Sequence, residues 1–120
     1  MRIVERPEIE EVLAGLDVLP LIESGFVAYS EGRAVVPPVG ELILDEGEVH
    51  IKYGFIGDEP WYVIKIASGF YKNPERGRPS GDGMMRLFSQ ATGQPVACLL
   101  EHGHLTDVRT AAAGAIGARY

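Results

Sequence analysis

The stretch EVHIKYGFIGDEPWYVIKIA, residues 48–67, contains two apolar segments separated by a turn. In residues 48–55 apolar side chains alternate with His, Lys and Gly, which is the two-residue period of a strand with one buried face. The apolar face comprises Val49, Ile51, Tyr53 and Phe55. Residues 57–60, Gly-Asp-Glu-Pro, are typical of a turn, and residues 61–67 are apolar at nearly every position. The stretch therefore predicts an antiparallel hairpin.

Further elements are predicted on both sides of this hairpin. Pro7 lies at the start of one expected helix, over residues 8–13, and Asp17 caps a second one that ends at Gly32. The other predicted strands are residues 33–36, 40–44, 84–89 and 95–100. Helices, then antiparallel strands, then a helix is the order of an α+β domain with a mostly antiparallel sheet, and not of alternating βαβ units.

The C-terminal sequence LTDVRTAAAGAIGARY, Leu105–Tyr120, predicts the last helix. Thr106 is the expected N-cap and Asp107 the acid of the first turn, which places Arg109 at about the third helical position. A helix rich in Ala and Gly has little apolar area, so we expect it to lie close against another backbone. It reaches Tyr120 without a Gly or Asn stop signal, and we expect residues 1–120 to be one domain of a longer protein.

Composition limits the classes of protein. The 120 residues can form one domain, and no charge-free apolar run approaches the ~18 residues of a membrane span. The single cysteine, Cys98, lies in an apolar run and is expected to be a buried thiol in a reducing, cytoplasmic setting. The net charge is −6, and the first 60 residues hold 13 acids and 4 bases. Such an acidic half argues against a nucleic-acid partner.

Lys65 interrupts the run WYVIKIA, which is apolar on both faces of the predicted strand. Burial of a lysine is unfavourable unless it is paired or functional, and burial lowers the pKa of the ammonium group. Two readings remain open: a lysine that binds a carboxylate or transfers a proton, and a strand-edge lysine that extends into solvent.

Two arginines are further candidates. Arg109 near a helix start would place a guanidinium beside free backbone N–H groups, a combination that binds carboxylates; an ordinary surface arginine is the alternative. Arg33, between a helix and a strand, is the weaker candidate.

The remaining polar clusters are weaker signals. The Gly69–Gly83 loop carries Lys72, Arg76 and Arg78, which could bind a phosphate or be solvated. His102 and His104 with Glu101 lack the further ligands of a metal site, so we expect no metal.

Three stretches together resemble the N-terminal part of the ornithine cyclodeaminase/mu-crystallin family. They are GRAVVPPVG (residues 32–40), YVIKIASGFYKNP (62–74) and TGQPVACLLEHGHLTDVRTAAAGAI (92–116). The resemblance implies a substrate-binding domain that dimerises through its sheet, followed by a Rossmann domain that binds NAD(P). It also implies reactions of small amino or imino acids: deaminating cyclisation of ornithine, reduction of cyclic imines, or amino-acid dehydrogenation.

By the same resemblance, Arg33 and Arg109 are the carboxylate-binding arginines, and Lys65 is the active-site lysine. Met84 or Met85 lines the pocket. Lys52 stands where ornithine-specific members have a glutamate, which argues against ornithine as substrate. We expect a homodimer that is an enzyme with NAD(P) when complete, and no cofactor or activity for this chain alone. Two alternatives remain: a non-catalytic carboxylate-binding or dimerisation module, and an inactive truncated product.

Overall fold

The computed structural model describes all residues, 1–120, and confirms the α+β class. The elements in chain order are β1 (Arg2–Glu5), α1 (Arg6–Ala14), α2 (Val18–Ser30), β2 (Ala34–Val35), β3 (Gly40–Ile43), β4 (Glu48–Ile56), β5 (Trp61–Gly69), η1 (Asn73–Arg76), β6 (Gly81–Ser89), β7 (Pro95–Leu100) and α3 (His104–Gly117). The predicted hairpin is β4–β5, and Asp58 in its turn has a positive φ of 71°. Asp17 caps α2 by accepting a hydrogen bond from the Leu19 N–H, as expected.

All strands form one sheet, with the order β1-β7-β6-β5-β4-β2 and with β3 also paired to β4. Every neighbouring pair is antiparallel except β1 with β7, which is parallel and pairs Ile3 with Cys98. Strand β1 was missed in the sequence because it has only four residues and pairs with a strand more than 90 residues later. Cys98 is buried, as predicted.

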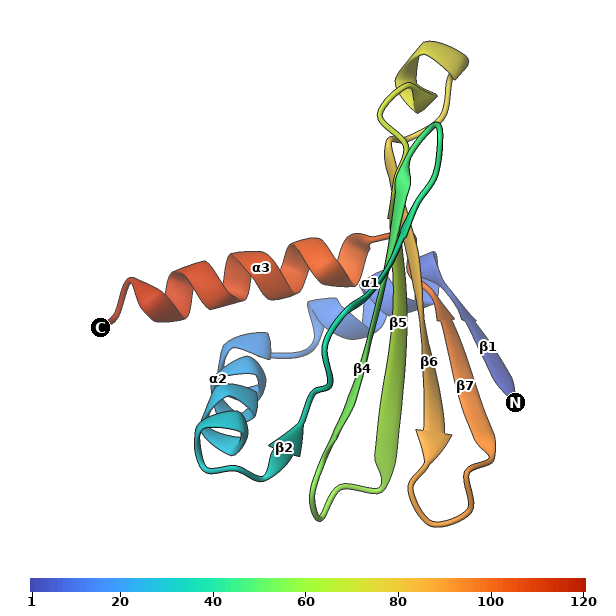
Figure 1. Cartoon of the computed structure of the whole chain (residues 1–120). Helices are drawn as coiled ribbons and strands as arrows, with labels where there is room; N and C mark the ends of the chain where they lie inside the picture. Colours follow the sequence, from blue (N-terminus) through green and yellow to red (C-terminus); the bar gives the residue numbers. More distant parts are fainter.

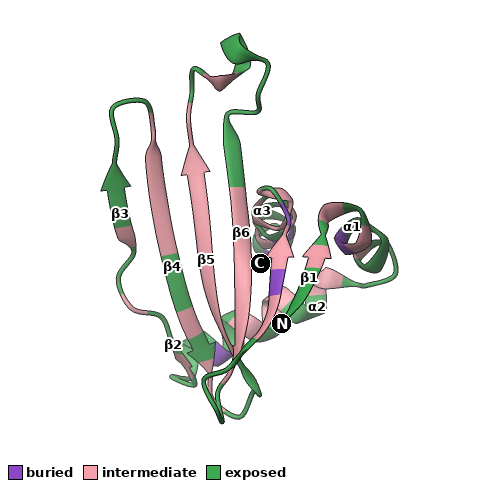
Figure 2. Cartoon of the chain, turned by 90° about the vertical axis from the view of Figure 1, so that its right-hand side faces the viewer, coloured by how far each residue is buried: buried purple, intermediate pink, exposed green.

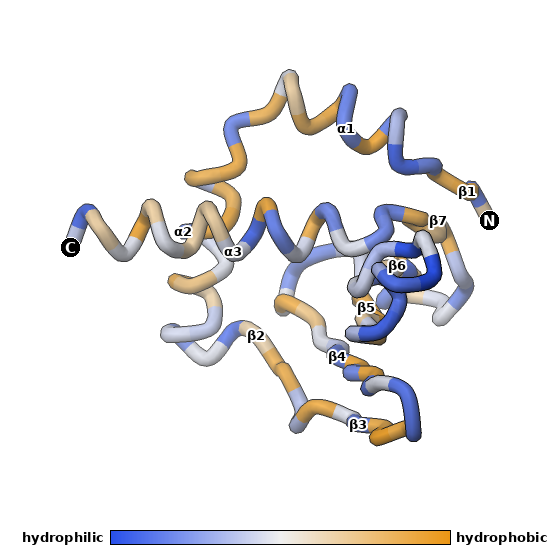
Figure 3. Tube along the Cα trace, turned by 90° about the horizontal axis from the view of Figure 1, so that it is seen from above, coloured by the Kyte–Doolittle hydropathy of each residue, from blue (hydrophilic) through white to orange (hydrophobic).

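The three helices lie on one face of the sheet, and the other face is left open (Figure 1). Seen from above, α3 lies between α1 and the strands β4–β6 (Figure 3). Helix α2 packs against α3, and the small buried residues Ala28 and Ala112 together with Ile116 form much of the core. The expected close packing of the Ala-rich helix is therefore found on one side of α3. Gly114 and Gly117 face open space.

The start of α3 differs from the prediction. The helix begins at His104, after His102 and Gly103 turn the chain with positive φ values of 54° and 85°. Thr106 is therefore not the N-cap, and Arg109 lies in the second turn, not the first. The prediction failed because this start is made by a left-handed backbone turn rather than by a side-chain hydroxyl.

The apolar face of β4 is not the face that the helices cover. Tyr53 and Phe55 are 43% and 41% exposed, and cross-strand pairing puts them on the same side as Ile64 and Tyr62 of β5. The open face of the sheet is shown toward the viewer in Figure 2. The helices instead cover the face that carries Lys52 and Lys65.

No single helix is long and apolar enough to cross a bilayer; only α1 and α2 together, bent by 95° at their junction, reach that length and composition.

Candidate functional site

Lys65 lies in the middle of β5, beneath the start of α3. Its cross-strand partners are Lys52 on β4 and Met85 on β6, so all three side chains share the helix-covered face. The Lys65 ammonium donates a hydrogen bond to the Thr106 hydroxyl of α3 (Nζ–Oγ1 3.1 Å). Lys65 is half-buried in a central strand, so it is not the solvated edge lysine that the sequence left possible.

The pKa of Lys65 is held below its ordinary value, chiefly because partial burial disfavours the charged ammonium. The positive charges of Lys52 and Arg109 lower it further, and the carboxylate of Glu101 opposes them. Lys65 therefore lies in a locally positive environment.

A cavity of about 270 Å³ opens between β4, β5 and the first turns of α3. It is lined by Lys52, Tyr53, Gly54, Val63, Lys65, Met85, Leu105, Thr106 and Arg109. The structure thus brings together Lys65 and Arg109, two of the residues predicted from the sequence. It adds Thr106, which the sequence did not identify, and it places in the same lining Lys52, which the family resemblance had aligned with the glutamate of ornithine-specific members.

None of the three cations around this cavity forms an ion pair, although six of the other eight Lys and Arg side chains of the protein do. Lys52 stands directly opposite Lys65 in the β4–β5 register. Like charges at opposed positions of a strand pair destabilise the sheet. A bound anion would reduce this repulsion, so the arrangement is suited to binding an anion.

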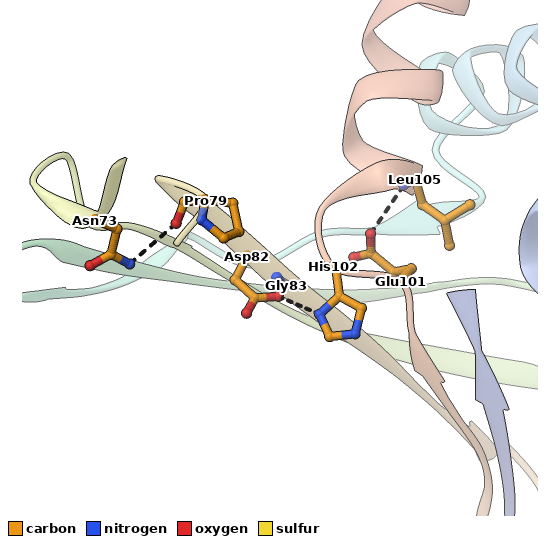
Figure 4. A network of polar contacts seen from close by, with 7 residues as sticks. All are labelled: Asn73, Pro79, Asp82, Gly83, Glu101, His102 and Leu105. Atoms are coloured by element: carbon orange, nitrogen blue, oxygen red, sulfur yellow. Dashed lines mark hydrogen bonds and ion pairs between the residues drawn. The ribbon is translucent and has the colours of Figure 1, made fainter. Parts of the chain in front are cut away.

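Glu101 connects β7 to this site and is fully buried. Its Oε2 accepts a hydrogen bond from the Leu105 N–H at the start of α3 (3.0 Å), and its Oε1 has no hydrogen-bond partner. Figure 4 shows Glu101 beneath the first turn of the helix. In the sequence, Glu101 is an acid directly after the apolar run of β7, and its pattern with His102 and His104 indicates only a weak metal-ligand candidate.

Two predicted residues lie away from the cavity. Arg33 stands before β2, and its Nε donates to Glu31 Oε2 at 2.9 Å. Met84 points to the open face, where it lines a separate hollow with Ile66 and Leu100. Its neighbour Met85 is the methionine in the cavity.

The cations of the loop between β5 and β6 lie beside acidic or polar residues outside the cavity. Lys72 and Arg76 both approach Glu46, at 3.9 and 3.7 Å. Arg78 lines a separate polar hollow with Asn73 and Asp82. These contacts fit the solvated loop better than a phosphate site.

Two of the three histidines, His50 and His102, lie beside acidic side chains. His102 contacts Asp82 (Nδ1–Oδ1 2.9 Å; Figure 4), and His104 is the first residue of α3. At the β3–β4 edge, ligand atoms of Glu41, Glu48 and His50 lie within 4.8 Å of one another. Glu48 there also accepts a hydrogen bond from the Tyr71 hydroxyl at 2.7 Å.

The fold of these residues does not fit a dinucleotide. Its only parallel pair, β1 with β7, is not joined by a single crossover helix, and Gly114 and Gly117 lie inside α3 rather than in a strand-to-helix turn. The glycine-rich turn and helix N-terminus that hold a pyrophosphate are therefore not found within residues 1–120.

The comparisons with known proteins agree on one family. A protein of Sinorhizobium fredii, named as an uncharacterized cyclodeaminase, is 41% identical over 124 residues, which cover 100% of this chain and 38% of that protein. An archaeal alanine dehydrogenase dimer with bound NAD superposes with a TM-score of 0.90 at 27% identity, covering 100% of this chain and 37% of the other.

The Thermococcus litoralis Δ1-pyrroline-2-carboxylate reductase, in complex with NADH and L-proline, shares the fold with a TM-score of 0.92. Its identity is 24%, over 100% of this chain and 38% of the reductase. The chain thus spans 37–38% of the length of these relatives. The family model for ornithine cyclodeaminase/mu-crystallin matches residues 1–120, and the chain belongs to that family, as its three motifs predicted.

Proposed function

We propose that residues 1–120 are the substrate-binding and dimerisation domain of a two-domain, NAD(P)-dependent enzyme that acts on a small amino or imino acid. The observation that carries this proposal is the cavity of about 270 Å³ with three unpaired cations around it. The reaction classes are amino-acid dehydrogenation, cyclic-imine reduction and deaminating cyclisation. The NAD-bound alanine dehydrogenase relative supports the first of them.

In this proposal the carboxylate of the substrate binds between α3 and β5. Arg109 presents a planar guanidinium that can donate two parallel hydrogen bonds to a carboxylate. Lys65 is the catalytic residue: it donates a further hydrogen bond and stabilises negative charge at the reacting end. Thr106 positions the Lys65 ammonium through the contact of 3.1 Å. Met85 forms the apolar wall on the β6 side.

We assign the NAD(P) site to a further domain, because no dinucleotide-binding unit is formed by these 120 residues. The role of this chain is to bind and orient the substrate beside that domain. The single cysteine is a free, buried thiol, which suits the reducing cytoplasm in which we place the enzyme.

We further propose that a second copy of the chain covers the open sheet face. Apolar residues such as Tyr53, Phe55 and Val35 are 41–47% exposed there, and Tyr62 stacks on Phe88 at a centroid distance of 4.9 Å. Contiguous exposed apolar area is typical of a protein interface. The dimeric alanine dehydrogenase supports this assignment.

The test is kinetic and uses the protein translated from the complete reading frame. We expect NAD(P)H-dependent reduction of a small imino acid, or of a keto acid with ammonia. Lys65→Ala and Arg109→Ala should each lower kcat/KM. The loss should correspond to at least about 3 kcal/mol of transition-state stabilisation. Arg119→Ala, at an exposed position two residues beyond the end of the same helix, is the matched control. Turnover close to wild type in both site variants would refute the site assignment.

A further inference from the structure

Lys52 is a surplus cation in the candidate site. A single substrate carboxylate is satisfied by the guanidinium of Arg109 and the ammonium of Lys65. Lys52 lies in the same cavity and opposite Lys65 across the β4–β5 pair, where directly opposed Cβ atoms are about 4.5–5.5 Å apart. A substrate with one carboxylate would therefore leave this third cation without a counter-ion.

The protein itself does not supply that counter-ion. Lys52 forms no ion pair, although Lys72 and Arg76 in the neighbouring loop share Glu46. The carboxylate of Glu101 raises the pKa of Lys65, but it is buried and already accepts a hydrogen bond from the Leu105 N–H. Lys52 is exposed whereas Lys65 is half-buried, so the two ammonium groups meet a ligand at different depths.

We infer that Lys52 is a specificity-determining residue and that the substrate carries a second anionic group, as in a dicarboxylic amino or imino acid. The inference rests on the proposed carboxylate site and names its substrate class. The α-carboxylate binds Arg109 and Lys65, and the distal carboxylate binds Lys52 nearer the opening. A distal ammonium or guanidinium group is disfavoured, because it would meet the Lys52 charge at short range.

The test is a binding titration of the protein from the complete reading frame, with and without NAD(H). The ligands share one backbone: L-alanine, L-aspartate and L-2,4-diaminobutyrate. We expect wild-type protein to bind L-aspartate at least about tenfold more tightly than L-alanine, and L-2,4-diaminobutyrate more weakly than either. The variants are Lys52→Met, Lys52→Glu and the control Lys72→Met, an exposed lysine of the β5–β6 loop.

Lys52→Met should bring the aspartate-to-alanine affinity ratio close to one, and Lys52→Glu should favour L-2,4-diaminobutyrate. Lys72→Met should keep the wild-type ratio. Equal binding of aspartate and alanine by wild-type protein, or an aspartate preference that survives Lys52→Met, would overturn this inference and leave the carboxylate site intact. Binding of none of the three ligands, with or without NAD(H), would overturn the carboxylate site and this inference together.

Discussion

At the residue scale, the position of Lys65 in a central strand excludes the strand-edge lysine that the sequence left open, and its role in binding or proton transfer stays a prediction. Its neighbours in the sequence show only that a charge interrupts an apolar strand. The position of that strand in the sheet and the nearness of α3 depend on pairing between distant segments, which local patterns do not report. Arg33 is the opposite case, because the sequence predicted it at the site and the structure places it outside the cavity. Arg33 pairs with Glu31 and does not line the cavity that Arg109 and Lys65 share.

The lowered pKa of Lys65 predicts a pH dependence of binding. A bound carboxylate stabilises the charged ammonium and so raises the pKa of Lys65 in the complex. The affinity for the carboxylate is then highest below the pKa that Lys65 has in the free protein, and it falls as pH rises through that pKa. Because burial, Lys52 and Arg109 lower that pKa against the opposing effect of Glu101, the fall should begin below the range of an ordinary lysine.

The measurement is the carboxylate dissociation constant across the alkaline range, for wild type and for Lys65→Arg. An arginine stays protonated throughout, so the variant should lose most of this pH dependence. The same alkaline fall in both proteins would show that another group titrates.

At the element scale, α3 shows how a helix start can escape prediction. The sequence offers Thr106 and Asp107 as conventional cap and first-turn acid. The chain instead turns at His102 and Gly103, and the side chain of Glu101 binds the Leu105 N–H from below. The Thr106 hydroxyl is then free to accept from Lys65. The helix was predictable from its Thr, Asp and Ala residues, but its first residue depends on a buried carboxylate at the end of β7.

Glu101→Ala should therefore destabilise the domain and weaken the site. Removal of the carboxylate leaves the Leu105 N–H without its side-chain partner, a loss of about 1–3 kcal/mol in the free energy of unfolding. Denaturant titration measures this loss. Carboxylate affinity should fall as well, because the start of α3 carries Thr106. Glu101→Gln keeps a side-chain carbonyl that can accept the same hydrogen bond, so it should lose much less. Equal losses in both variants would assign the effect to the negative charge.

At the scale of the whole molecule, the chain buries little of its apolar surface. Only six of the 120 residues are buried, a small core for a domain of this length. The hairpin, every strand except β1 and the class of fold were predicted from the sequence, and the alternation in β4 correctly predicted which of its residues share a face. The alternation could not predict what covers that face, because periodicity describes a single strand. Which segments pack on the face depends on the tertiary structure. The apolar face was expected to lie inside the domain and lies on its surface.

That open face predicts a dimer whose interface is sensitive to charge. The wild-type protein should have twice the mass of its chain in light scattering, because the exposed Tyr53 and Phe55 would otherwise face water. Phe55→Lys places a charge in the middle of this apolar surface and should yield a monomer with an unchanged circular dichroism spectrum. Leu21→Lys, at a position 60% exposed on α2, is the control and should remain dimeric. A folded wild-type monomer at high protein concentration would contradict the second copy as the cover of this face. Dissociation by both variants would instead show that any added lysine weakens the assembly, so the contrast between the two positions is what locates the interface on the sheet.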